Sequence, residues 1–206
     1  MAKTEDIIRG KIGNTVFYRV GGETRMRSAA SNYLDADTDK QRENRSRLRV
    51  ALRFYQRVPE ACSREAWKIA AAGSTTSGYN LFMKQNMMVF KPDGKIGDFS
   101  RLQLSAGLLQ KVDNLVVTAG KDDTVTLAWD KEVDLPSARA DDRLVVIVLY
   151  ANRSFTPVFV ETDGATRGDG RATIRLSRKR GTAAHLYCFF REKEGKAYSG
   201  SQYVRI

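Results

Sequence analysis

The clearest hydrophobic pattern in this chain is a helical one between Thr38 and Val58. Thr38 is followed three residues later by Gln41, the spacing of a capping box that starts a helix. Pro59 pushes the residue before it out of helical geometry and so ends the helix. At 100° per residue the apolar positions share one arc, which we expect to be buried: Leu48, Ala51, Leu52, Phe54, Tyr55 and Val58.

The opposite arc of this predicted helix carries five arginines, here called the arginine face: Arg42, Arg45, Arg49, Arg53 and Arg57. Residues 40–68 hold nine basic and three acidic side chains, so much of the net charge of +11 lies here. Like charges three or four positions apart repel on a helix. The pattern fits a docking face for an anionic surface, and it also fits a solvated face.

Alternating positions predict a β-hairpin over 10–27, with Gly21 and Gly22 at the turn. Three arginines of the hairpin would extend the arginine face: Arg19, Arg25 and Arg27. Two strands alone are marginal, so the hairpin needs the helix or another chain to cover it. Two more helices are predicted, at 63–72 and 78–90, and we assign Trp67, Phe82 and Met88 to the core.

From about residue 115 the period changes to that of strands. Seven short apolar segments are separated by turn residues, which predicts a two-sheet β-sandwich. Val125, Leu127 and Trp129 alternate onto one face, and Tyr187 is a candidate corner tyrosine. We therefore predict an α+β hairpin-and-helix module over 1–95 and an all-β sandwich over 105–206, and expect a fragment 101–206 to fold alone.

The sequence has no pattern typical of an enzyme. It lacks a G-x-S-x-G, phosphate-loop or dinucleotide motif, and one histidine with two distant cysteines is too few for a zinc site. The tripeptide Arg167–Asp169 reads as ordinary turn residues, the acidic pairs at 122–123 and 141–142 as loop residues, and His185 as structural. We expect no catalytic residue, cofactor, metal or small-molecule substrate.

The longest apolar run, Leu144–Ala151, is too short to span a bilayer. Residues 1–10 have no apolar core of signal-peptide length. We therefore expect no membrane partner and synthesis in the cytoplasm, with the protein becoming part of an assembled particle as a further expectation.

The order of short motifs resembles a family of uncharacterised two-domain proteins. The motifs are Gly10-Lys-Ile-Gly-Asn, an arginine-rich hairpin, a Thr-x-x-Gln-x-x-x-Arg helix, a tryptophan helix and Gly78-Tyr-Asn-Leu-Phe. The family is frequent in gut Bacteroidota and in phage-like gene clusters, and its members end in a fibronectin- or immunoglobulin-like domain. The resemblance implies that architecture and favours a structural protein or phage-like particle component.

Two functions remain open. The first is a structural or assembly protein whose basic N-terminal module docks on a protein partner or on copies of itself by protein–protein interaction. The second is nucleic-acid binding without sequence preference, through phosphates held by the arginine face. A basic run before the last hairpin would add a second contact in that case: Arg178, Lys179 and Arg180. No Asn or Gln is placed for base reading, so sequence-specific DNA binding is the least favoured variant. The family resemblance and the predicted sandwich favour assembly, which we rank first.

Overall fold

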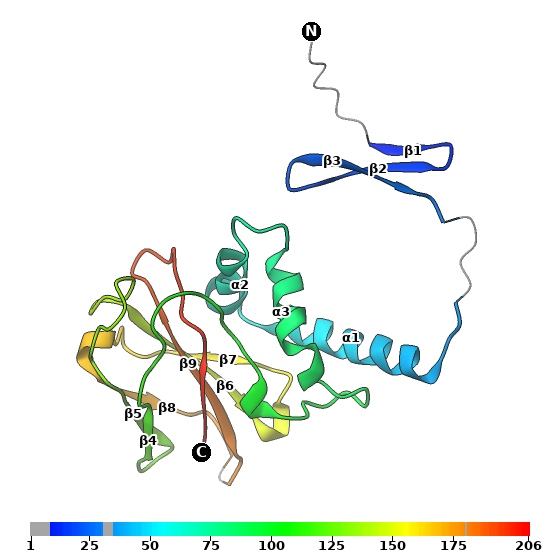
Figure 1. The fold of residues 1–206 in the computed structure, drawn as a ribbon. Coiled ribbons are helices and arrows are strands. Elements are labelled where there is room, and N and C mark those ends of the chain that lie inside the picture. Colours follow the sequence, from blue (N-terminus) through cyan, green and yellow to red (C-terminus); the bar gives the residue numbers. More distant parts are fainter. Residues whose placement is uncertain (1–8, 31–34, 180) are drawn as a thin grey trace.

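The computed structural model describes residues 9–30, 35–179 and 181–206, and contains a few helices and several antiparallel sheets (Figure 1). The N-terminal hairpin has a third strand, so the described strands here form a three-stranded sheet in the order β1-β2-β3: Gly10–Ile12, Thr15–Val20 and Glu23–Ser28. Gly21 and Gly22 occupy the predicted turn with φ of 60° and 88°, angles that glycine adopts without strain. None of these strand residues is buried, so the helices do not cover this sheet.

Helix α1 spans Asp39–Arg57. The predicted capping box is present: the Gln41 amide donates to Thr38 Oγ1 at 3.3 Å, and the Thr38 amide donates to Gln41 Oε1 at 3.0 Å. Its buried side differs from the predicted one, because Leu48 and Leu52 are exposed. Ala51, Phe54 and Val58 are buried as predicted, and Val50 joins them in the core.

The buried side of α1 is set by contacts with other segments of the same chain. Arg47 stands on the buried side of α1, where its Nε donates to the carbonyl of Phe90 at 3.0 Å. Phe54 packs against Phe90 and Phe155 with ring centroids 5.2 and 5.7 Å away. These contacts come from segments distant in sequence, which a helical projection does not contain.

After Pro59 the chain forms a π-helical turn, Glu60–Arg64, followed by α2 (Glu65–Ala70) and α3 (Gly78–Asn86). Helix α3 begins at Ser77, whose hydroxyl accepts from the Asn80 amide at 3.2 Å. A side chain at Gly78 would overlap the Trp67 backbone at 2.7 Å, so glycine allows α2 and α3 to approach closely. Trp67 and Phe82 are buried as expected, whereas Met88 is exposed and does not belong to the core.

Within 96–179 and 181–206 the structure describes seven strands in two antiparallel sheets. One has the order β4-β5-β8 and the other β10-β9-β6-β7, and they comprise β4 Val116–Ala119, β5 Thr124–Ala128, β6 Arg143–Tyr150, β7 Val158–Val160, β8 Arg171–Arg175, β9 Ala184–Arg191 and β10 Gln202–Arg205. Val125, Leu127 and Trp129 are all buried, as the alternation predicts. Strands β6 and β9 pair over their whole length, from Arg143 opposite Arg191 to Tyr150 opposite Ala184.

The four-stranded sheet is buried on both faces. Alternate residues of β6 and β9 contribute to a core shared with β5 and β8, and the remaining ones to a core shared with the helices. The second core joins Phe54, Trp67 and Phe82 to residues of the sheet: Val145, Ile147, Leu149, Tyr187 and Phe189. The boundary between 1–95 and 105–206 stays a prediction, but these two parts of the chain do not have separate cores.

The connecting segment 96–112 fastens the helices to the sheet. The carbonyl of Leu104 accepts from Trp67 Nε1 at 3.2 Å, and the Leu104 amide donates to Ser201 Oγ at 3.0 Å. The Tyr187 hydroxyl donates to the carbonyl of Phe99 at 2.8 Å. Tyr187 therefore holds this segment and is not the corner tyrosine of a strand-to-strand loop.

We predict that fragment 101–206 does not fold cooperatively, in contrast to the expectation from sequence. Without the helices it exposes the outer apolar face of β6 and β9, and large exposed apolar patches favour aggregation. Fragment 38–206, which keeps α1 to α3, is the matched control and should show a sigmoidal thermal transition. Sharp near-ultraviolet circular dichroism and a cooperative transition for 101–206 would contradict the shared-core interpretation.

We also predict that stability falls on mild acidification because of His185. Its ring stacks on Phe99 at 3.7 Å between centroids, and its Nδ1 lies 2.9 Å from the Tyr203 hydroxyl. Burial, together with the charge of Arg205, lowers the pKa of His185 below its ordinary 6.5. The unfolded chain therefore binds a proton first, and the melting temperature should decrease as pH falls below about 6.5.

The measurement compares thermal unfolding at pH 7.5 and 5.5, where carboxylates of ordinary pKa near 4 change little. The decrease in melting temperature should be smaller in His185→Gln than in the wild type. An equal decrease in both proteins would show that another group controls the acid side.

Candidate functional site

The N-terminal end of the arginine face is neutralised by the aspartates that precede α1. Arg45 lies 2.6 Å from Asp35 and 3.4 Å from Asp37, and Arg42 contacts Asp37 at 3.0 Å and also Asp39. The hydrogen bond from Arg45 is the main cause that lowers the pKa of Asp35. Two of the five arginines of this face therefore have carboxylate partners within the chain.

The remaining arginines of this face differ from one another. Arg49 and Arg53 are exposed, and the described part of the chain places no carboxylate within ion-pair distance of either. Arg57 donates to the carbonyl of Phe155 at 3.4 Å, so the helix contacts the β7 side of the sandwich there. The arginine face is thus reduced to a short patch around Arg49 and Arg53.

The register of the sheet β1-β2-β3 separates its residues into two unlike faces. Residues directly opposite each other on adjacent strands share a face. The basic face contains Lys11, Val16, Tyr18, Arg25 and Arg27, together with Val20 and Glu23, whose carboxylate lies 3.4 Å from the Arg25 guanidinium. The apolar face contains Ile12, Phe17 and Met26, with Ile12 67% and Met26 73% exposed.

Arg19 does not belong to the basic face. It lies on the same side of β2 as Phe17, and its guanidinium donates to the Gly22 carbonyl at 2.6 and 3.2 Å. Of the three hairpin arginines named from the sequence, the structure brings Arg25 and Arg27 together and uses Arg19 to hold the turn.

The predicted second basic contact lies in the β8–β9 connection, away from the N-terminal sheet (Figure 1). Arg178 binds Asp123 at 3.1 Å and donates to the Thr182 carbonyl at 2.9 Å, so it holds this connection together. Lys179 is exposed, and Arg180 lies outside the described residues. Arg178 therefore does not extend the arginine face.

Sequence reasoning missed a buried ion pair that the first residue of the turn tripeptide forms with a distant aspartate. Arg167 is 1% exposed, pairs with Asp142 at 3.4 Å and stacks over the Phe190 ring at 3.9 Å. Its Nη2 also donates to the Gln110 carbonyl at 2.8 Å. Burial lowers the pKa of Arg167, while Asp142 opposes that shift. The tripeptide is structural, and the acidic pair at 141–142 has one buried member with this role.

A patch that the sequence did not indicate combines apolar and acidic residues. Leu108 is 90% exposed, and the segment 130–135 exposes Val133 and Leu135. The Gln110 side chain holds the two segments together, because its Nε2 donates to the Glu132 carbonyl at 3.2 Å and its Oε1 accepts from the Asp134 amide at 2.9 Å. We call this surface the acidic patch: Leu108, Asp130, Glu132, Val133, Asp134 and Leu135. A sequence signal was the alternation of acidic and apolar residues at 132–135.

Within the described residues no helix is long and apolar enough to cross a membrane, and no cluster of three or more His, Cys, Asp or Glu side chains is placed to hold a metal ion.

Comparison with known proteins adds little to this geometry. Curated protein sequences contain no match. Among solved structures, the chain is similar to the solution structure of the fn3 domain of human contactin 1, with 9% identity, a TM-score of 0.33, and coverage of 50% of this chain and 79% of that chain. Residues 7–205 match the model of a protein family that is described as "Family of unknown function (DUF6266)". The chain therefore belongs to the DUF6266 family, whose function is unknown.

Proposed function

We propose that this protein is a non-enzymatic assembly component that joins copies of itself head to tail. The observation that carries the proposal is the uncovered N-terminal sheet. A three-stranded sheet needs a covered hydrophobic face for stability, yet this one buries no strand residue in the single chain. Exposed apolar residues gathered on one face are typical of an interaction surface.

A second copy of the chain offers a surface that fits this sheet. Residues 9–28 carry five basic side chains and one acidic, whereas residues 130–135 carry three acidic and one basic. Ile12 and Met26 expose apolar surface on the first, and Leu108, Val133 and Leu135 on the second. The two surfaces are different parts of the chain, so a contact between them would be heterologous and would form rings or filaments.

The sandwich acts in this proposal as a rigid spacer between the two surfaces. We assign residues 105–206 to an immunoglobulin/fibronectin-like sandwich, and a seven-stranded arrangement of two facing antiparallel sheets supports that assignment. A repeating spacer with a docking sheet at one end also suits a phage-like particle component, the role implied by the family resemblance.

We predict that the wild-type protein forms concentration-dependent oligomers and that Met26→Asp abolishes them. A charge in the apolar face would be buried without a partner on assembly, which is strongly unfavourable. Light scattering after size exclusion measures the mass. Met88→Asp is the matched control, since Met88 is similarly exposed but lies on neither proposed surface.

Charge exchange tests the pairing itself. Arg25→Glu/Arg27→Glu and Asp130→Lys/Glu132→Lys should each weaken assembly, because Arg25 and Arg27 lie on the face opposite Met26 and attract the acidic patch through the net charge of the sheet rather than by direct contact. An equimolar mixture of the two variants should assemble again, since the two surfaces then again carry opposite net charge. A monomeric wild type at all concentrations, or a mixture that stays monomeric while both variants remain folded, would refute the head-to-tail contact.

Nucleic-acid binding is the second candidate, and the basic face of the sheet favours it. Lys11, Arg25 and Arg27 flank Tyr18 on this face, a combination suited to phosphates and to base stacking. The apolar face has no counterpart on a nucleic acid, which is why we rank this function second.

The second candidate predicts binding of a fluorescent DNA duplex that weakens steeply with salt. Lys11→Gln/Arg25→Gln/Arg27→Gln should then bind at least about tenfold more weakly, because each lost phosphate contact removes a released counterion. Arg171→Gln/Arg175→Gln, on exposed positions of β8, is the control. Equal binding by both variants, or no binding at about 50 mM salt, rules this function out.

A further inference from the structure

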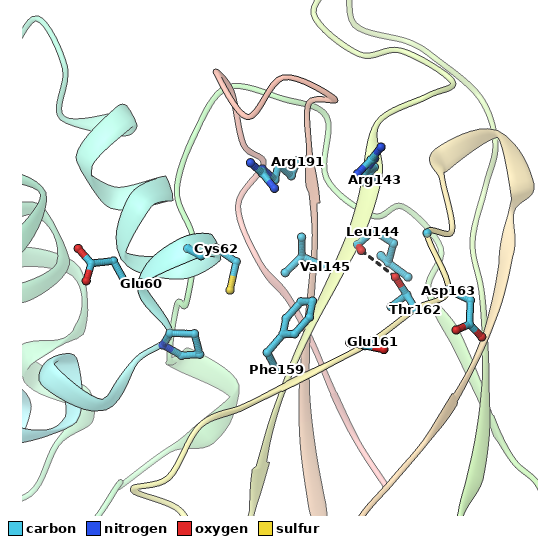
Figure 2. Close-up of a pocket in the computed structure, with 13 residues that line it drawn as sticks. Glu60, Cys62, Arg143, Leu144, Val145, Phe159, Glu161, Thr162, Asp163 and Arg191 are labelled. Atoms are coloured by element: carbon cyan, nitrogen blue, oxygen red, sulfur yellow. Dashed lines mark hydrogen bonds between the residues drawn. The ribbon is translucent and has the colours of Figure 1, made fainter.

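A cavity of about 490 Å³ lies between the π-helical turn after α1 and the N-terminal end of β6 (Figure 2). It exists because β7 pairs with β6 only over Val146–Val148, so the first residues of β6 pair with β9 on one side and have no β7 residue on the other. The segment after β7 satisfies one backbone group of β6 there, because Thr162 Oγ1 donates to the Leu144 carbonyl at 3.1 Å. The floor is apolar, with contributions from both parts of the molecule: Pro59, Cys62, Leu144, Val145 and Phe159.

Two arginines stand at one end of this cavity. Arg143 and Arg191 lie directly opposite each other on β6 and β9, and Figure 2 shows both above Val145. Among the described residues neither guanidinium has a carboxylate within 4 Å, and the Nε of Arg191 is buried without a hydrogen-bond partner. Like charges opposite one another on adjacent strands destabilise a sheet, and a buried unpaired N–H adds to that cost. An anion between the two guanidinium groups would relieve both.

The acidic residues around the cavity do not fill that role. Glu60 is held outside by Arg64 and Lys68 at 3.0 and 2.9 Å. Glu161 and Asp163 are exposed beside Thr162, on the other side of the cavity from Arg191 in Figure 2. The cavity therefore has a cationic end, an apolar floor and an open acidic rim.

We propose that this cavity binds a carboxylate with an apolar body, the carboxylate between Arg143 and Arg191 and the body against Val145 and Phe159. Two guanidinium groups match a carboxylate in charge and in hydrogen-bond geometry. The volume lies within the usual range of ligand sites, and Phe159 is 47% exposed and so has free surface to offer. Such a group belongs to a free organic acid or to the C-terminal residue of a peptide. The site is independent of assembly, and no motif in the sequence indicated a small ligand.

The test uses 4-phenylbutyrate as the probe, with 4-phenylbutanamide as its neutral match, both titrated by calorimetry to about 10 mM. The acid should bind at least about tenfold more tightly than the amide, because charge-assisted hydrogen bonds are lost with the charge. Arg143→Gln/Arg191→Gln should remove that preference. Arg175→Gln, on an exposed position of β8, should leave it unchanged.

A second readout is independent of the arginines. The Cys62 sulfur lies at the cavity wall in Figure 2, whereas Cys188 is fully buried elsewhere. Bound acid should slow the alkylation of Cys62 by iodoacetamide, followed by mass spectrometry, and Phe159→Ala should weaken that protection. Thermal unfolding of each variant establishes that it is folded.

Two peptides distinguish the sources of the carboxylate. N-acetyl-Ala-Ala-Phe with a free C-terminus binding more tightly than 4-phenylbutyrate, and losing affinity on amidation, would assign the site to a peptide end. Weaker binding of the peptide would assign it to free acids. Equal binding of acid and amide, binding that survives in the folded double variant, or no binding of any probe would overturn the proposal.

Discussion

The apolar contact between the three helices and the outer face of β6 and β9 is the interaction on which this structure depends. Phe82 stands at its centre, with the ring centroids of Trp67 and Tyr55 at 5.4 and 4.9 Å. Such pairs stabilise beyond the area they bury. Without this contact the four-stranded sheet would present a continuous apolar face to water. Helices as short as α2 and α3 would also not stay helical on their own.

The cavity, the exposed N-terminal sheet and the acidic patch all lie beyond the part of the sheet on which the helices pack. The helices cover β6 and β9, but β7 pairs with β6 only over Val146–Val148, and the arginine-lined cavity forms beside the preceding residues of β6. The N-terminal sheet lies beyond the cover altogether and keeps an apolar face in solvent. The acidic patch lies on segments that connect the two sheets. Each proposed contact therefore occurs where the shared core ends.

The basic residues have three different environments. Some form ion pairs with nearby carboxylates: Arg42 and Arg45 with aspartates before α1, and Arg178 with Asp123. Arg167 is buried in the core, where removing either partner of its ion pair is expected to cost about 3–5 kcal/mol. A third group is exposed and has no carboxylate within ion-pair distance among the described residues, and it includes Arg27 on the sheet and Arg49 and Arg53 on α1.

The sequence by itself determined the local elements of this protein. The capping box at Thr38, the glycine turn at 21–22 and the alternation at Val125, Leu127 and Trp129 all depend on neighbours within a few residues, and all are present. Tertiary structure decided which face of α1 is buried, because Phe90 and Phe155 come from distant segments. It also decided which arginines are paired and which face the cavity. Those outcomes depend on packing and charge between residues far apart in the chain, and periodicity along one segment carries no information about them.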